Sequence, residues 1–386
     1  MFIEIGTEEC SPAPAEPRVN NYKSMLRVIR FFTKIINTTY YLHLSKKPTL
    51  INLLMKKILL ACFAAICLLH SHAQMDSTYA EKLGFPKGAK VVILHVDDAG
   101  MSYDSNDGAI TAITKGVATS TSVMMPCAWV PGFVHFLKQH PEIDAGLHLT
   151  LTSEWKDYRW GPLAGKDAVP GLVDKEGDLW PSVEEVVKHA TADEVETEIK
   201  AQLARARSMG FEPTHLDSHM GTLFATPAFT QRYVKLGIEN HIPVMMPGGH
   251  NTLIALQMQA TDVAMDQARA AGKMLWNAGL PVLDDLHNTT YDWPIPDSVK
   301  DDNIKLQRYK TAKYIAALKE LKPGLTMMIM HCTNTSPLFK YISSSGPVRM
   351  GDMLTMINPV FKKALEDEHI ILTTWREVMA RRQRKI

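Results

Sequence analysis

Short apolar runs alternate with longer segments of helical pattern along most of this 386-residue chain. The runs have the length of strands and begin near residue 90, and most gaps between them are long enough for a helix. Parallel strands need a crossover connection between them, which is usually a helix. The alternation therefore predicts the α/β class, with a mostly parallel sheet or barrel.

The pattern gives approximate bounds for these elements, and some boundaries have a local cause. Thr191 followed by Glu194 predicts a capped helix start, and Gly210 predicts the end of that helix. We expect strands near 90–96, 118–124, 143–149, 213–217, 242–246, 281–286, 325–331 and 369–373. We expect helices near 105–115, 130–139, 191–209, 226–239, 261–278, 303–321, 352–367 and 375–383.

The first 74 residues have a different character. A basic start at Met55-Lys56-Lys57 precedes the apolar run 58–69, and small residues at Ser71 and Ala73 follow. The run is too short to span a bilayer, and the three parts together are typical of a signal peptide. Cleavage is expected before Gln74.

These features divide the chain into three parts. We expect residues 1–54 to be a non-native upstream extension, 55–74 a signal peptide, and 75–386 one domain. The mature protein would then be periplasmic or secreted, with no stable membrane span. For residues 1–54, a genuine N-terminal anchor is the alternative interpretation.

Charge and cysteine content exclude some classes of function. Nine basic and four acidic residues precede Gln74, so 33 basic and 37 acidic residues remain, a net charge of about −4. Such a surface does not favour nucleic acid as a partner. Only Cys127 and Cys332 follow the expected cleavage point, too few for a disulfide framework or a thiolate zinc site.

Two adjacent carboxylates, Asp97 and Asp98, close the first apolar run. Catalytic groups gather at the carboxyl ends of strands in parallel α/β architectures. Neighbouring side chains of a strand point to opposite faces, so the two could do different work. One could bind a cation while the other moves a proton. A plain surface turn is the alternative for this pair alone.

Histidines end three later runs, at His148, in the block 213–219, and at His331. His215 and His219 would be about 13 Å apart in a strand, too far to bind one metal together unless the strand ends between them. Asp217 could orient a histidine from behind. His331 would lie on the same rim, where an imidazole suits a general acid.

Two stretches fit the alternation poorly and carry aromatic residues. The first, 151–190, contains Trp155, Trp160 and Trp180, and the second, 287–300, contains Tyr291 and Trp293. Aromatic rings can stack on sugars, and they can equally pack a loop onto a barrel. Both interpretations stay open.

Five blocks together resemble a known family. They are His-Val-Asp-Asp-Ala-Gly (95–100), Ser102 to Gly108 with Asn106, Gly-Leu-His-Leu-Thr (146–150), Thr-His-Leu-Asp-Ser-His (214–219) and Met-His-Cys (330–332). In this order, over about residues 89–383, the chain resembles the YdjC-like carbohydrate deacetylases, which include chitooligosaccharide deacetylases. The resemblance implies a distorted parallel (β/α) barrel like that of polysaccharide deacetylases.

The resemblance also implies roles for these residues. Asp98, His148 and His219 would hold one divalent metal ion. Zinc is the first choice, and nickel, cobalt and magnesium are alternatives. Asp97 would be the general base and His331 the general acid. His215, Asp217 and Asn106 would lie around the site, against the substrate or behind the ligands.

Two departures from the family pattern concern the pocket. Ala99 stands where the family usually has Phe, and Met220-Gly221-Thr222 follows His219 where further histidines are usual. The metal ligands and the base survive both changes, so the departures bear on pocket shape and substrate.

The expected function is metal-dependent removal of the N-acetyl group from an amino sugar or oligosaccharide, with release of acetate. Hydrolysis of another amide or an ester is one alternative. A non-catalytic glycan-binding protein is another, although Asp97 and His331 argue against it. A homodimer is an open expectation for the assembly.

Overall fold

The structure is a computed structural model that describes residues 77–384. The expected upstream extension (1–54) and signal peptide (55–74) lie outside the described residues. Within 77–384, no helix combines the length and the apolar character that crossing a membrane requires.

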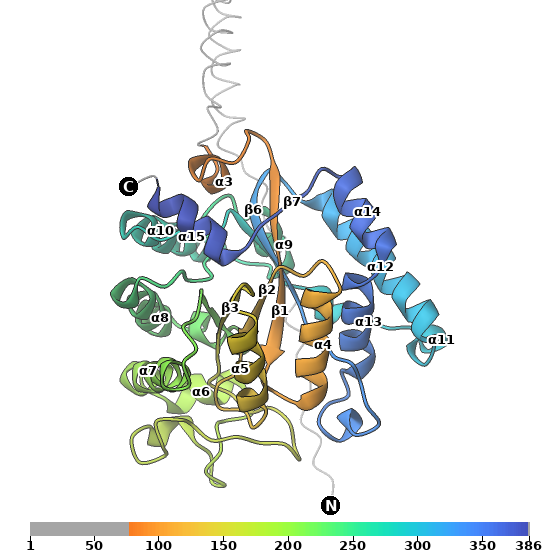
Figure 1. Ribbon diagram of the computed structural model, residues 1–386. Coiled ribbons are helices and arrows are strands. Elements are labelled where there is room, and N and C mark those ends of the chain that lie inside the picture. Colours follow the sequence, from red (N-terminus) through yellow and green to blue (C-terminus); the bar gives the residue numbers. More distant parts are fainter. Residues whose placement is uncertain (1–76, 385–386) are drawn as a thin grey trace, which may run out of the picture. The chain divides into compact units, whose positions relative to one another are not determined.

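Seven parallel strands form one sheet, as the alternation predicted (Figure 1). Its order is β4-β3-β2-β1-β6-β5, and β7 pairs with the beginning of β1. The strands are β1 Lys90–Ala99, β2 Ser120–Val123, β3 Ala145–Leu149, β4 Leu216–Ser218, β5 Asp285–His287, β6 Gly324–Met330 and β7 Ile371–Leu372. β1 is central and nine of its ten residues are buried, which explains its nearly continuous apolar sequence.

Residues 243–248 join the two edges of this sheet. Isolated parallel bridges pair Leu216 with Val244 and Pro247 with Leu283. The expected strands 242–246 and 281–286 are therefore present mainly as single bridges, and only Asp285–His287 forms a regular strand. The result is a parallel barrel with one irregular side, in agreement with the expected distorted barrel.

Helices cover the outside of the strands (Figure 1). The helices that the sequence predicted are α4 Tyr103–Thr114, α5 Val130–Gln139, α7 Ala192–Ser208, α8 Pro227–Asn240, α10 Asp262–Asn277, α12 Asn303–Glu320 and α15 Trp375–Gln383. Two helices, α13 Gly346–Met356 and α14 Pro359–Asp367, are found where one was expected. Shorter helices that it did not predict are α3 Tyr79–Lys82, α6 Val183–His189, α9 Thr252–Gln257 and α11 Asp297–Lys300. Four 3₁₀ turns are η1 Pro170–Leu172, η2 His219–Phe224, η3 Thr290–Asp292 and η4 Phe339–Tyr341.

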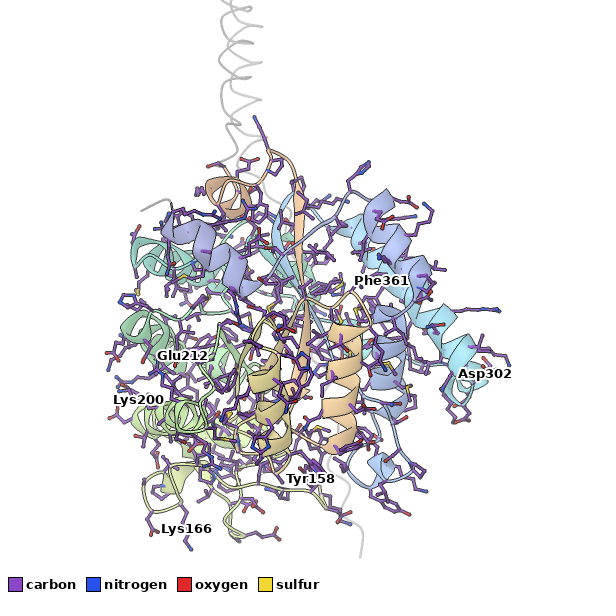
Figure 2. The ribbon with its side chains drawn as sticks, viewed as in Figure 1. Tyr158, Lys166, Lys200, Glu212, Asp302 and Phe361 are labelled. Carbon is purple, nitrogen blue, oxygen red and sulfur yellow. The ribbon has the colours of Figure 1, made fainter. Side chains whose placement is uncertain are left out.

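Two helix boundaries illustrate what sequence pattern does and does not determine. The predicted capping box of α7 forms, with Thr191 and Glu194 each accepting a backbone N–H of the other. The single helix expected over 352–367 is wrong, because Pro359 restricts Asn358 to an extended conformation and the chain breaks into α13 and α14. Phe361 of α14 is fully buried and packs against Tyr314 (Figure 2).

The long segment after β3 covers the carboxyl-end side of the barrel, where Tyr158 and Lys166 are labelled in Figure 2. Its aromatic residues anchor it to the barrel. The Trp160 indole is buried and donates to the Thr152 carbonyl, and the Tyr158 hydroxyl donates to the Met101 carbonyl. For these two residues the packing interpretation holds.

Candidate metal centre

Five predicted residues converge at the carboxyl ends of neighbouring strands. Asp97 and Asp98 lie in β1 and His148 in β3, whereas His219 and His331 directly follow β4 and β6. The strand-end rule therefore brings together groups that are up to 234 positions apart in the sequence.

The backbone at Asp98 changes direction within the strand. Asp98 has φ of 64°, a left-handed conformation that is uncommon for residues other than glycine, and the β1–β2 register shifts between Val96 and Ala99. As a result both carboxylates face the same space. Asp97 Oδ2 and Asp98 Oδ1 lie 3.9 Å and 3.3 Å from Nε2 of His148. The expectation that the pair points to opposite faces is therefore wrong.

Asp98, His148 and His219 form a three-residue cluster that could hold a metal ion. Asp98 Oδ1 lies 3.3 Å from His148 Nε2 and 3.3 Å from His219 Nδ1. This oxygen is buried and has no hydrogen-bond partner among the described residues. A buried carboxylate oxygen without a partner is costly, and a cation between the three groups would satisfy it. Two other groups of three can be formed from the described residues, but both contain Asp217, which does not line the cavity described below.

Each histidine of the cluster is held by a second carboxylate on its other nitrogen. His148 Nδ1 donates to Asp217 Oδ1 at 2.7 Å, and His219 Nε2 lies 3.1 Å from both carboxylate oxygens of Glu154. Such a contact fixes the ring orientation and directs the opposite nitrogen at the metal. Asp217 thus lies where the sequence expected an orienting group. Glu154 was not predicted, although it is an acidic residue in the segment that leaves β3.

These carboxylates also control the charge of the imidazoles. Burial opposes protonation of His219, but Glu154 and Asp98 outweigh it and raise the pKa of His219 to about 9. Burial likewise opposes protonation of His148, and Asp97 and Asp217 raise its pKa well above the ordinary value. Both imidazoles therefore favour protonation, and a cation that binds between them would compete with these protons.

Arg349 of α13 completes the surroundings of Asp98. Its guanidinium donates to Asp98 Oδ2 at 2.6 Å. Burial opposes ionisation of Asp98, but Arg349 and the neighbouring histidines hold its pKa well below the usual range. One oxygen of Asp98 is thus paired with arginine, and the other faces the two imidazoles. No local pattern in the sequence marks Arg349.

Asp97 is held from behind by a buried histidine. His95 Nε2 lies 3.0 Å from Asp97 Oδ1 and 2.8 Å from Asp217 Oδ2. Burial opposes protonation of His95, but Asp217 and Asp97 raise its pKa to about 9. His95 therefore links Asp97 to Asp217, the carboxylate that orients His148. The sequence placed His95 in a motif without giving it a role.

His331 faces both aspartates from the neighbouring strand end. Its Nε2 lies 4.0 Å from Asp97 Oδ2 and 3.7 Å from Asp98 Oδ2. Burial lowers the pKa of His331, and Arg349 lowers it further against the opposing effect of the aspartates. The backbone N–H of His331 donates to Asp352, which forms a fully buried ion pair with Lys310 at 2.6 Å.

Two other predicted residues lie away from the open site. His215 is fully buried, stacks on Trp375 at 5.2 Å, and does not line the cavity. Its ring also leaves no room for a side chain at Gly146, where a Cβ would approach it to 2.5 Å. Asn106 accepts from the Gly100 N–H and donates to a backbone carbonyl. Asn106 thus fixes the loop after β1, and it does not line the cavity described below.

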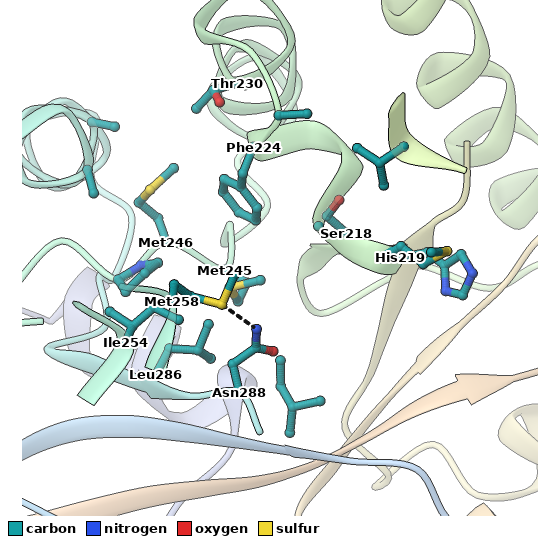
Figure 3. Close-up of a pocket in the computed structure, with 18 of the residues that line it drawn as sticks. Ser218, His219, Phe224, Thr230, Met245, Met246, Ile254, Met258, Leu286 and Asn288 are labelled. Carbon is teal, nitrogen blue, oxygen red and sulfur yellow. Dashed lines mark hydrogen bonds between the residues drawn. The ribbon is translucent and has the colours of Figure 1, made fainter. Parts of the chain in front are cut away.

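One cavity of about 1490 Å³ opens onto the cluster. Its polar lining includes Asp97, Asp98, His148, Glu154, His219, His331 and Arg349. The lining from residues 245–274 is mostly apolar (Figure 3), whereas α8 contributes apolar residues together with the charged Arg232, Lys235 and Glu239. A hydrated cation and a substrate carrying a polar group could therefore both reach the cluster from one side.

Comparison with known proteins gives a consistent set of similarities. Residues 91–367 match the family model described as YdjC-like protein. A carbohydrate deacetylase of Thermus thermophilus is 30% identical over 300 residues, which cover 77% of this chain and 97% of that protein. A chitooligosaccharide deacetylase of Yersinia enterocolitica is 34% identical over 134 residues, which cover 34% of this chain and 49% of that protein.

A solved structure has a similar fold at low sequence identity. It is a protein of Enterococcus faecalis V583 named for cellobiose-phosphate cleavage, with a TM-score of 0.59 and 18% identity. The match covers 75% of this chain and 99% of that one. At this identity the likeness concerns the fold alone.

Proposed function

The chain belongs to the YdjC-like protein family, and on this basis we propose that it is a hydrolase that removes the acetyl group from an N-acetylated sugar. The carbohydrate deacetylase of Thermus thermophilus supports this substrate class, because the similarity extends over nearly its full length. Release of acetate and a free amine is the proposed net reaction.

The observation that carries the proposal is the unpartnered Asp98 Oδ1 between two oriented imidazoles at the edge of a cavity. Asp98, His148 and His219 would hold a divalent cation there. One carboxylate with two imidazoles suits zinc, nickel or cobalt, with zinc as the first choice and magnesium as a harder alternative. When bound, the cation would polarise the acetamide carbonyl and acidify a water molecule.

Asp97 is the proposed general base. Its Oδ1 is held by His95, and its Oδ2 faces His331 across 4.0 Å. A carboxylate fixed in this way can take the proton of a water molecule as the water oxygen forms a bond to the acetamide carbon. The neighbouring His95 keeps that carboxylate in one orientation.

His331 is the proposed general acid. As the bond between the carbonyl carbon and nitrogen breaks, the nitrogen needs one proton, and His331 Nε2 lies across the cavity 4.0 Å from the proposed base and outside the proposed ligand set. The lowered pKa of His331 makes its protonated form a stronger acid, which favours transfer to the departing amine. The proton lost by water thus balances the proton gained by nitrogen.

Acetate release by the purified protein tests this function. Chelator-treated protein would be reloaded with zinc, nickel, cobalt or magnesium and incubated with N-acetylglucosamine and its β-linked oligomers. We expect acetate and free amine in equal amounts, with activity restored by at least one metal. Reloaded protein that releases no acetate from any N-acetylated sugar, yet hydrolyses another amide or an ester, would contradict the proposed substrate class.

Export is a separate proposal that rests on the sequence from Met55 onward. A cleaved signal peptide would place the site in the periplasm or outside the cell, where acetylated glycans are encountered. N-terminal sequencing of the protein from its native host should give a start at Gln74. A mature protein that keeps residues 1–54 would contradict this proposal.

A further inference from the structure

The cavity at the metal cluster has two chemically different ends. Polar groups gather where β1, β3 and β4 end, and mainly apolar side chains line the part formed by α9, α10 and residues 245–247. The lining from α8 is mixed and includes the charged Arg232, Lys235 and Glu239. Figure 3 shows Met245, Met246 and Met258 on one side of the view, and Ser218 and His219 on the other. We call Met245, Met246, Met258, Met265 and Met274 the methionine wall.

Size and exposure indicate that this wall contacts a ligand. The cavity of about 1490 Å³ exceeds the roughly 300–1,000 Å³ of ordinary small-molecule pockets. Met258 and Met274 line it with 57% of their surface exposed to water. A sugar presents mainly hydroxyl groups, so an acetylated sugar alone would leave this surface wet. Methionine is flexible and polarizable, and methionine-rich surfaces adapt to apolar ligands of variable shape.

The order of polar and apolar groups indicates where the apolar part of a substrate is attached. A long acyl chain on the nitrogen would start directly at the cluster, where Glu154, Ser218 and Arg349 line the cavity. A chain on the sugar would start one ring further away. Along the cavity the metal cluster comes first, then the polar zone, then the methionine wall. An acetamide, a sugar ring and an apolar chain would follow one another in the same order.

We propose that the substrate is an N-acetylated sugar that carries an apolar aglycone, and that this aglycone lies against the methionine wall. The inference rests on the proposed function for the position of the acetamide. The continuity of the wall with the metal cluster in one cavity favours a part of the substrate over a second copy of the chain as the occupant.

Binding of sugars that cannot be deacetylated tests the wall without any turnover. Hexyl β-D-glucoside and methyl β-D-glucoside differ by five methylene groups, and neither has an acetyl group. Each fully buried methylene raises affinity about fourfold, so partial burial should give the hexyl glucoside at least ~10-fold tighter binding by calorimetry below its micelle concentration. Equal binding of the two glucosides, or none of either, would overturn the inference.

Substitutions on and beside α9 and α10 test whether the methionine wall causes the tighter binding of the hexyl glucoside. Met258→Glu with Met274→Glu places charge in the wall, whereas Leu256→Glu with Val263→Glu changes two nearby apolar residues that are somewhat more exposed and do not line the cavity. The wall variant should lose the hexyl preference by ~10-fold or more, and the control variant should keep it. Loss of the preference in both variants, or in neither, would reject the wall as its cause.

Turnover separates this inference from the proposed function. The ratio of kcat/KM for hexyl and methyl N-acetyl-β-D-glucosaminide should exceed ~10 and should fall in the wall variant alone. If neither compound releases acetate, the proposed function fails while the glucoside binding still tests the wall. If both release acetate at equal efficiency, the function stands and the inference fails. Sedimentation that shows a dimer dissociating only in the wall variant, with the hexyl preference unchanged, would assign the wall to a second copy.

Discussion

The two sides of the barrel wall are built differently. On one side β1 pairs with β6 over seven consecutive residues, from Lys90 with Gly324 to Val96 with Met330. On the other side residues 243–287 are joined to their neighbours by two isolated bridges and a three-residue strand. Every group of the metal cluster, together with Asp97 and His331, lies on or directly after a strand of the regular side. The methionine wall lies on the irregular side.

This difference indicates that the regular side positions the groups of the metal cluster and that the irregular side provides the apolar contact surface. Ligand atoms must stay within a few tenths of an ångström of their positions, and a continuous ladder with charged contacts behind each ligand provides that. An apolar contact needs only a surface of suitable shape, so an irregular segment is sufficient there. Substitutions on the two sides should therefore change different measurable properties.

The largest effect is expected from His148→Ala and His219→Ala. Each removes a proposed ligand on the regular side, so bound metal should fall from about one ion per chain to near zero, and activity should fall by at least ~10³-fold. Elemental analysis with circular dichroism measures metal content and fold together. His135→Ala, on the exposed face of α5, is the matched control. Full metal content in both ligand variants would move the metal centre elsewhere.

Asp97→Asn and His331→Ala should lower turnover without removing the metal. A positioned acid or base contributes on the order of 10²-fold or more, and neither side chain belongs to the ligand cluster. Acetate release at equal metal content measures the effect. Full activity of metal-loaded Asp97→Asn would reject that carboxylate as the base.

Asp217→Asn and Glu154→Gln should weaken metal binding about 10–100-fold, because each carboxylate contacts the far nitrogen of a proposed histidine ligand. Asp217→Asn should have the larger effect, since Asp217 is fully enclosed and also faces His95. Competition with a chromophoric chelator gives both affinities. Unchanged affinity in both variants would show that the ligands do not depend on these contacts.

The smallest effect concerns stability on the irregular side. Burial lowers the pKa of His287 in β5 to about 4. The folded protein therefore binds this proton less readily than the unfolded chain, and the contribution of His287 to stability is present above pH 6.5 and is lost as pH falls toward 4.

For His287 the loss between pH 7 and pH 5 should be about 2 kcal/mol of unfolding free energy. Urea unfolding of the metal-free wild type and of His287→Asn at the two pH values isolates the contribution of His287 to the unfolding free energy. The imidazoles of the metal cluster have raised pKa values and act in the opposite direction. Identical pH dependence in the two proteins would show that His287 does not contribute.

The sequence predicted most of the fold because the alternation of strands and helices is local. Nearly every expected long helix is present within a few residues of its expected bounds, and the strand ends carry the predicted aspartates and histidines. The exceptions have definite causes. Pro359 divides one expected helix, and residues 242–246 are extended without a continuous partner strand.

The parts of the site that the sequence did not predict depend on contacts between distant segments. Arg349 meets Asp98 across 251 positions, and Glu154 meets His219 across 65. Glu154 could have been found by extending the strand-end rule to the segment that follows β3. The left-handed backbone at Asp98 could not have been predicted in this way, because neighbouring side chains of a regular strand point to opposite faces.

The two isolated bridges around residues 243–248 also bear on how the barrel moves. Residues 243–248 make four backbone hydrogen bonds to Leu216 and Leu283 but no continuous ladder, so we expect this seam to open locally before the seven-residue β1–β6 ladder does. Amide hydrogens of this seam should exchange with solvent well before those of β1. Local opening of this seam would widen the apolar end of the cavity and admit a bulky ligand, while the metal cluster keeps its geometry.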